Sequence, residues 1–156
     1  MIPKDGHGIE TIFMKSESVF LDSNIFVYSV DNSAGEKQKT AKHLLTKHEQ
    51  ENNGVISTQV LQEFYVVATK KLGIIPDLAR TYLNAIQDME TVIISPILID
   101  EAIGLQLRFQ ISFWDALILQ SAVFSNCQYL YTEDLNHGQK YCSVTVLNPF
   151  TNEINF

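Results

Sequence analysis

The chain has 156 residues, of which 46% are hydrophobic and 19% are charged, and its formal net charge is −7. This size predicts one compact domain with a substantial core, and no repeat, low-complexity stretch or linker divides the sequence. The negative net charge argues against a broad basic surface that binds nucleic acid. No apolar run is long enough to cross a membrane.

The first part of the chain predicts two strands and a helix. Residues 1–18 are polar and form a predicted N-terminal extension ahead of a domain over residues 19–156. A short buried strand is predicted over Val19–Asp22, and the spacing of apolar residues in Glu36–Glu49 predicts an amphipathic helix. Gly54–Ser57 is apolar and short, which predicts a second strand.

The middle of the chain is mainly helical by its pattern. Thr58–Leu72 predicts a helix that stops at a glycine, and a proline opens the next helix over Pro76–Met89. The β-branched run Thr91–Ile94 predicts a strand. Two further helices are predicted over Ser95–Phe109 and Ser112–Ser125, each beginning at a capping serine.

Two strands are predicted near the C-terminus, over Gln128–Thr132 and Ser143–Leu147, with the turn-rich segment Asp134–Gly138 between them. Short apolar strands that alternate with helices indicate a doubly wound α/β fold, in which helices cover both faces of a central, mainly parallel sheet. Such sheets carry their functional sites at the carboxyl ends of the strands.

Four carboxylates stand beside apolar runs at predicted element ends: Asp22, Glu63, Asp115 and Asp134. Ionised carboxylates in apolar surroundings are costly unless they are paired, hydrogen-bonded or bound to a cation. Several carboxylates brought close together would repel one another unless a divalent cation balanced their charge. Oxygen ligands without a histidine or cysteine cluster favour Mg²⁺ or Mn²⁺ over Zn²⁺.

Each of these acids also has a purely structural interpretation. Asp22 is placed to cap a helix, and Asp115 follows Ser112 in the Ser-x-x-Asp spacing of a capping box. Glu63 could point into solvent from its helix, and Asp134 could stabilise a turn. The recurrence of all four acids beside apolar runs favours a shared site over four unrelated structural roles.

Four segments in order resemble the motifs of the PIN-domain nucleases, and in particular the VapC-like toxin ribonucleases of bacterial toxin–antitoxin pairs. Together they extend over nearly the whole chain after Ser18. The segments are Phe20–Ile25, Gln62–Phe64, Phe113–Ile118 and Tyr131–Gly138.

The resemblance implies a PIN-like three-layer fold and a metal-dependent endoribonuclease. The residues that would hold one or two Mg²⁺ or Mn²⁺ ions and carry catalysis are Asp22, Glu63, Asp115 and Asp134, and Asn24 and Thr132 match supporting positions. The implied partners are an RNA substrate, a cognate antitoxin protein that inserts a basic side chain at the acidic site, and a second copy of the chain in a homodimer. The ion would lower the pKa of a bound water and screen the scissile phosphate.

Several alternatives stay open at this point. The chain could be a non-catalytic module that binds RNA or protein, or an RNA-processing nuclease outside a toxin–antitoxin system. A phosphatase that uses Asp22 as a covalent nucleophile is disfavoured, because Asn24 stands where a second aspartate is expected. Neither Glu133 nor His137 is assigned a role, although both lie beside the fourth motif.

Cysteine usage and the N-terminal sequence predict where the protein works. Cys127 and Cys142 are too few for a disulfide framework and lack metal-ligand spacing, so both are expected to be buried thiols. The N-terminus has no basic stretch followed by an apolar run of signal-peptide length. Both observations predict a cytoplasmic protein.

Overall fold

The computed structural model describes residues 17–151, and a six-stranded sheet lies at its centre. The strands are β1 (Val19–Leu21), β2 (Gly54–Ser57), β3 (Glu90–Val92), β4 (Tyr129–Tyr131), β5 (Lys140–Tyr141) and β6 (Val144–Leu147). Their order across the sheet is β3-β2-β1-β4-β6-β5, and all neighbours are parallel except β5 and β6. The prediction of a mainly parallel sheet is confirmed.

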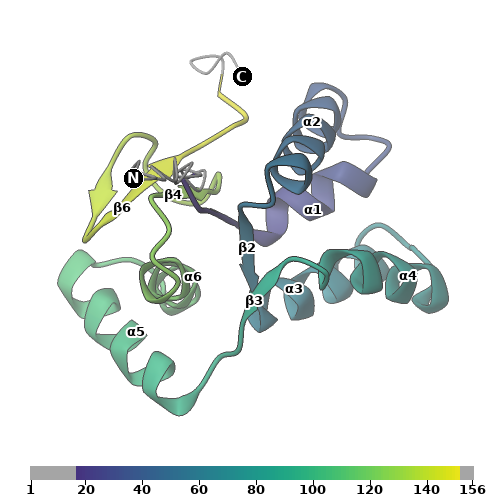
Figure 1. Ribbon diagram of the computed structural model, residues 1–156. Helices are drawn as coiled ribbons and strands as arrows, with labels where there is room; N and C mark the ends of the chain where they lie inside the picture. The colour runs from purple at the N-terminus through teal and green to yellow at the C-terminus, as the bar shows by residue number, and fades with distance from the viewer. Residues whose placement is uncertain (1–16, 152–156) are drawn as a thin grey trace, which may run out of the picture.

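Helices cover both faces of this sheet (Figure 1). They are α1 (Ser23–Val30), α2 (Glu36–Glu51), α3 (Thr58–Lys70), α4 (Pro76–Ile86), α5 (Pro96–Phe109) and α6 (Phe113–Phe124). α6 packs against β2, β4 and β6, and α5 packs on the outside of α6. On the other side α1 packs against α2 and α3, α3 packs against α4, and α2 and α3 also contact β2.

Serine caps fix where three of the helices begin. The side chains of Ser57, Ser95 and Ser112 each accept a hydrogen bond from a backbone N–H in the first turn of α3, α5 and α6, respectively. Such caps satisfy N–H groups that have no partner inside the helix. The serine starts of α5 and α6 are therefore confirmed, and Ser57, which was not predicted as a cap, ends β2 and begins α3.

The core lies between the sheet and the helices that flank it. Phe20, Leu21 and Leu130 in the central strands are fully buried, as are Phe64 of α3 and Leu119 of α6. α6 is buried over most of its length, because it lies between the sheet and α5.

Some local predictions were wrong. β3 ends at Val92 rather than Ile94, since the chain turns away from the sheet edge and Ile93 is 68% exposed. β5 was not predicted, because two residues carry no periodic signal. Cys127 is buried as expected, but Cys142 is exposed, because it lies in the tight turn between β5 and β6 with φ of 53°. The predicted extension, residues 1–18, lies outside the described residues except for Glu17 and Ser18.

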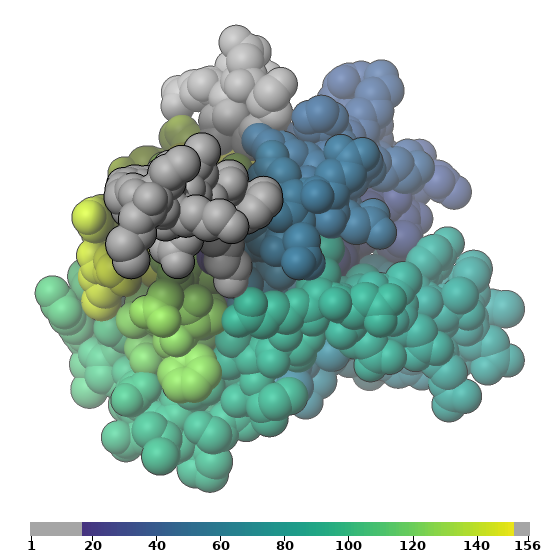
Figure 2. Space-filling model, viewed as in Figure 1, coloured from purple at the N-terminus to yellow at the C-terminus, as the bar shows by residue number. Residues whose placement is uncertain are grey.

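The outer surface of α5 carries several exposed apolar side chains. Ile97 is 70% exposed and Leu107 is 68% exposed. The α5 segment forms part of the lower surface in the space-filling view (Figure 2). Within residues 17–151, no helix is both long and apolar enough to span a membrane.

Candidate active site

The carboxyl ends of β1 and β4 meet at the centre of the sheet. Leu21 pairs with Tyr131, and the Asp22 N–H donates to the Tyr131 carbonyl at 3.1 Å. The strand order runs from β1 towards β2 and β3 on one side and from β4 towards β6 on the other, which makes this the switch point of the sheet. Parallel α/β sheets bind their ligands in the crevice at this point.

Asp22 is the first residue after β1 and is only 3% exposed. Its Oδ2 accepts a hydrogen bond from Thr132 Oγ1 at 2.7 Å, and its Oδ1 accepts one from the Ser23 N–H at 2.6 Å. The pKa of Asp22 is raised to about 7, mainly by burial and also by the charges of Glu63 and Asp134, although these two hydrogen bonds lower it. Asp22 thus caps α1 and also faces two other carboxylates, so its structural and functional interpretations are compatible.

Glu63 lies in the second turn of α3, and its side chain reaches the carboxyl end of β1. Its Oε2 accepts a hydrogen bond from Ser23 Oγ at 2.6 Å, and its Oε1 accepts one from Gln59 Nε2 at 2.8 Å. Gln59 Nε2 also donates to the Trp114 carbonyl at 3.2 Å, which ties α3 to the first turn of α6. Glu63 is therefore held toward the site and does not extend freely into solvent.

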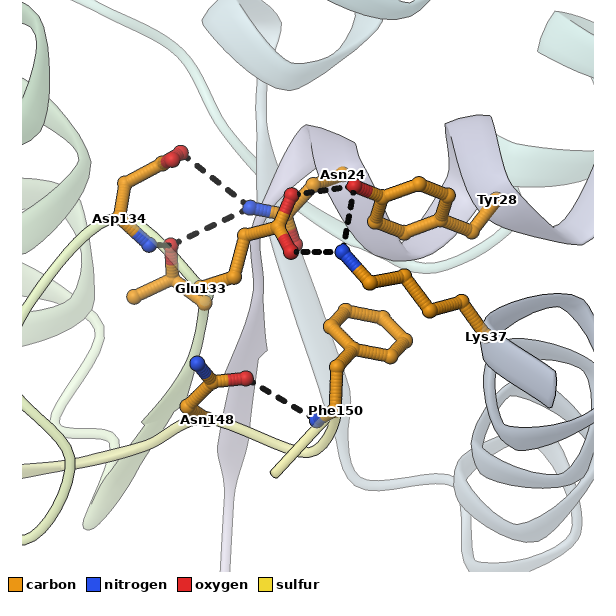
Figure 3. Close-up of polar contacts among 8 residues, drawn as sticks. Asn24, Tyr28, Lys37, Glu133, Asp134, Asn148 and Phe150 are labelled. Carbon is orange, nitrogen blue, oxygen red and sulfur yellow. Dashed lines mark hydrogen bonds and ion pairs between the residues drawn. The ribbon is translucent and has the colours of Figure 1, made fainter. Parts of the chain in front are cut away.

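Asp134 lies in the loop after β4 and shares donors with the residues around it. Asn24 Nδ2 donates to Asp134 Oδ2 at 3.2 Å and to Thr132 Oγ1 at 3.3 Å, and the Asp134 N–H donates to Thr132 Oγ1 at 3.1 Å (Figure 3). Partial burial raises the pKa of Asp134, and so do the charges of Asp115, Glu133 and Glu63. Asn24 and Thr132 thus join Asp22 to Asp134.

Asp115 lies in the first turn of α6 and takes part in the predicted capping interaction. Its N–H donates to Ser112 Oγ at 3.0 Å, and Ser112 Oγ lies 2.7 Å from Asp115 Oδ2. In a capping box the acidic side chain reaches the backbone N–H of the cap, whereas here it bonds to the cap hydroxyl. Since its charge raises the pKa of Asp134, Asp115 also belongs to the same acidic region.

A second polar cluster borders this region and includes Glu133. Lys37 Nζ of α2 forms an ion pair with Glu133 Oε2 at 2.8 Å and donates to Tyr28 Oη at 3.0 Å, while Tyr28 Oη donates to the other Glu133 oxygen (Figure 3). The Lys37 ammonium also lies over the rings of Tyr28 and Phe150. Glu133 is therefore committed to this cluster, which fastens the β4–β5 loop to α1 and α2.

His137, the other residue left unassigned, lies further along the same loop. Its Nδ1 accepts a hydrogen bond from the Asn148 N–H at 3.0 Å. This contact joins the loop to the segment after β6 and gives His137 a structural role.

Comparison with known families identifies the family of this chain. The model of the PIN domain family matches residues 19–141. The chain belongs to the PIN domain family. No curated protein matches it.

Solved structures resemble this PIN domain in fold. Mycobacterium tuberculosis VapC20, described as a Sarcin-Ricin loop cleaving toxin, is 19% identical with a TM-score of 0.60, over 72% of this chain and 87% of that one. A toxin–antitoxin complex from Klebsiella pneumoniae is 22% identical with a TM-score of 0.60, over 85% and 98%. VapBC2 from Rickettsia felis, solved bound to a DNA fragment from its promoter, is 20% identical with a TM-score of 0.59, over 82% and 96%. At these identities the likeness establishes the fold.

The site of this PIN domain is rich in hydrogen-bond acceptors. Asn24 Oδ1 and Gln59 Oε1 are buried and have no hydrogen-bond partner. Among residues 17–151, no lysine or arginine forms an ion pair with Asp22, Glu63 or the other two predicted acids. Unsatisfied oxygens beside mutually repelling carboxylates fit a hydrated divalent cation, because Mg²⁺ binds through one or two carboxylates and several waters.

The same residues do not form a compact metal cage. Within the described part of the chain, no three His, Cys, Asp or Glu side chains lie close enough together to hold one ion. Three of the carboxylates each accept a hydrogen bond from a different hydroxyl group. Asp22 accepts from Thr132, Glu63 from Ser23 and Asp115 from Ser112. That all four acids hold the ion together therefore stays a prediction.

A cavity lies away from this region. It measures about 580 Å³ and is lined by α1, α2 and α4 near the amino ends of the strands, at Gly54 and Met89. Its lining includes the buried His48, whose Nδ1 bonds to Asn53 Oδ1 at 2.8 Å and whose pKa is lowered by burial. This cavity does not gather several carboxylates as the switch point does, so we place the candidate site at the carboxyl ends of the strands.

The sequence motifs point to Asp22, Asn24, Thr132 and the other acids but not to the donors that position Glu63. Ser23 lies within the motif segment Phe20–Ile25 without an assigned role, and Gln59 lies outside every motif segment. Gln59 and Glu63 are four residues apart in α3, and this spacing places two side chains on one helix face. The spacing was the available signal, but only the fold shows that Gln59 also reaches α6.

Proposed function

We propose that this PIN domain is a metal-dependent endoribonuclease that hydrolyses RNA phosphodiester bonds and acts as the toxin of a type II toxin–antitoxin pair. The observation that carries the proposal is the acidic region at the switch point of the sheet. Three elements and one loop contribute acids to it, and burial together with the charges of neighbouring acids raises the pKa values of Asp22 and Asp134. Repulsion between clustered carboxylates is unfavourable, and a bound cation would compensate for it.

We assign the ion, Mg²⁺ or Mn²⁺, to the carboxylates of Asp22, Glu63, Asp115 and Asp134. When bound, a divalent ion of this kind lowers the pKa of a coordinated water and screens the charge of the phosphodiester. PIN nucleases generally use a divalent metal, which agrees with the oxygen-only set of side chains.

The chain itself contributes orientation and charge. Thr132 Oγ1 donates to Asp22 Oδ2 and accepts from Asn24 Nδ2, so it orients the Asp22 carboxylate. Ser23 fixes Glu63 in the same way. Supporting contacts of this kind orient the ligands of metal sites.

The test is cleavage of labelled RNA by the purified full chain. We expect cleavage with Mg²⁺ or Mn²⁺ and none in EDTA, and we expect Asp22→Asn and Asp115→Asn to lose nearly all activity. Asp100→Asn is the matched control, because Asp100 is an exposed acid on α5 outside the site. Equal cleavage in EDTA, or wild-type rates for both site variants, would contradict the proposal.

The toxin role is supported by the fold likeness to proteins that are described as toxins and toxin–antitoxin complexes. We infer a cognate antitoxin that inserts a basic side chain at the acidic site, because opposite charge is complementary to it. Expression of the chain should arrest growth, and expression of a neighbouring gene should relieve the arrest. Arrest that persists with Asp115→Asn would point to a cause other than catalysis.

We also propose that the chain forms a homodimer. The exposed apolar residues on α5, including Ile97 and Leu107, offer a surface that a second copy could cover. Light scattering at several protein concentrations measures the mass directly. A monomer at all concentrations would exclude the homodimer without affecting the nuclease assignment.

Two alternative functions predict different results in the same assays. A non-catalytic RNA- or protein-binding module should bind RNA in EDTA and should tolerate neutral substitutions at Asp22 and Asp115. An RNA-processing nuclease outside a toxin–antitoxin system should cut RNA without arresting growth. Mapping the cleavage ends in cells after brief expression distinguishes these cases and identifies the RNA.

A further inference from the structure

Trp114 is the single tryptophan of the chain and is 63% exposed. Tryptophan is highly buried in most proteins, so an indole left in solvent is informative. Trp114 lies in the first turn of α6, directly before Asp115.

The backbone of Trp114 is bound to the acidic region. Its carbonyl accepts a hydrogen bond from Gln59 Nε2 at 3.2 Å, and the same nitrogen donates to Glu63 Oε1 at 2.8 Å. One residue later, Asp115 contributes its charge to Asp134. The indole therefore projects from a backbone segment that is fixed beside the carboxylates of the candidate site.

The ring of Phe113 contacts the Trp114 indole but leaves most of it exposed to solvent. The ring of Phe113 packs against Trp114 with centroids 5.2 Å apart and an angle of 65° between the ring planes, which is an edge-on contact. Such contacts are favourable and limit ring rotation. A restrained aromatic ring that remains exposed is suited to stacking on another flat group.

The charge of the protein explains why such a ring would be needed. With a formal net charge of −7, the chain repels a polyanion, and Lys37 at the border of the site is already paired with Glu133. Proteins that hold single strands combine basic grooves with aromatic side chains, on which unpaired bases stack. Where the basic component is weak, stacking must supply more of the affinity.

We propose that Trp114 stacks on an unpaired nucleobase of the RNA substrate, next to the phosphodiester that is cut. The inference rests on the proposed function and narrows its substrate to RNA that is single-stranded at the cleavage point. Trp114 would position the substrate, and it takes no part in the bond-breaking step.

Because Trp114 is the sole tryptophan, its fluorescence reports on this contact directly. We would titrate the full chain with a single-stranded RNA of about ten nucleotides in EDTA and about 0.15 M salt, where long-range repulsion is screened. An abasic oligomer of the same length carries the phosphates without the bases. We expect saturable quenching with the RNA and none with the abasic oligomer.

Variants separate stacking from bulk. Trp114→Leu should weaken RNA binding, measured by anisotropy of labelled RNA, by roughly tenfold, whereas Trp114→Phe keeps a ring and should stay within about threefold of wild type. Phe124→Leu is the matched control, because Phe124 lies at the other end of α6 and is 61% exposed. This control should bind as wild type.

The outcomes distinguish this inference from the proposed function. If wild type cuts RNA with Mg²⁺ but shows no quenching, and Trp114→Leu cuts at the wild-type rate, stacking is wrong while the nuclease function stands. A second outcome is that RNA quenches the fluorescence and Trp114→Leu weakens binding, but no metal supports cleavage. This result would support stacking and refute the nuclease function. If RNA does not quench and Trp114→Leu turns a dimer into a monomer, a second copy covers the indole and the inference is overturned.

Discussion

Replacing Asp22 by asparagine should make the metal-free protein more stable, although it should abolish the proposed activity. Asp22 is 3% exposed, and burial raises its pKa from 3.8 to about 7. In the unfolded chain the same carboxyl ionises freely in water. The folded state above pH 7 therefore carries a buried charge that asparagine, with nearly the same shape, would remove.

The size of the effect follows from the pKa change. A shift of this size corresponds to about 4 kcal/mol at about 1.4 kcal/mol for each pKa unit. Asparagine caps helices about as well as aspartate, but the hydrogen bond from Thr132 must re-form, at a cost of about 1 kcal/mol. The net gain is about 3 kcal/mol, or roughly 6–12 °C in the unfolding temperature of a domain of this size.

The sign of the pH dependence is fixed by the direction of the shift. Because the folded pKa is raised, the folded protein holds a proton on Asp22 that the unfolded chain releases between about pH 4 and pH 7. The contribution of Asp22 to the free energy of unfolding is therefore complete below about pH 4 and is lost as the pH rises to about 7. Asp22→Asn lacks this dependence.

Thermal unfolding followed by circular dichroism in EDTA measures this difference. The gap between Asp22→Asn and wild type should be largest at pH 8 and should shrink towards zero between about pH 4 and pH 5. Asp100→Asn, at an exposed position, should match wild type within about 0.5 kcal/mol throughout. If Asp22→Asn unfolds below wild type at pH 8, or if its advantage does not depend on pH, the reasoning is refuted.

Three further predictions concern the ion, the bordering cluster and the core. Millimolar Mg²⁺ should raise the unfolding temperature of wild type more at pH 8 than at pH 5, because protons compete for the carboxylates; a shift of equal size at both pH values, read by calorimetry, would count against a carboxylate site. Lys37→Met removes the ion pair of Glu133, so the negative charge of Glu133 should raise the pKa of Asp134 further. The acid limb of the pH–rate profile should then move to higher pH, and adding Glu133→Gln should return it to its original position. Leu119→Ala should cost about 2–5 kcal/mol in urea unfolding, because Leu119 is fully buried, while Leu107→Ala at a 68% exposed position should cost about 0.5 kcal/mol or less; equal losses would mean that the two sites are packed alike.

Much of the fold was predictable because local signals agreed. The serines that begin α5 and α6 are caps in the structure, and each apolar run that was predicted as a strand contributes to the sheet. The exceptions occur where local signals are weak. β5 is two residues long, and Cys142 is exposed because it occupies a turn that no neighbouring residue predicts.

The sequence predicted where part of the candidate site lies but not how its side chains are held. The positions of Asp22 and Asp134 after apolar strands predicted that both reach one edge of the sheet, and hydrogen bonds through Thr132 and Asn24 connect them there. The sequence could not show that Ser23 and Gln59 hold Glu63, or that Glu133 pairs with Lys37 and not with a metal site. These contacts join residues that are far apart in the chain, so they depend on how the helices pack.

Local signals in the sequence predicted most elements of this protein and the acidic residues of its candidate site, because apolar periodicity, caps and charged side chains can be recognised from a few neighbouring residues. The tertiary structure alone decided which donors hold each carboxylate and how strongly the acids repel one another. It also left Trp114 exposed beside them. Burial and distance between remote residues govern these properties, and both are set only when the sheet and its helices have come together.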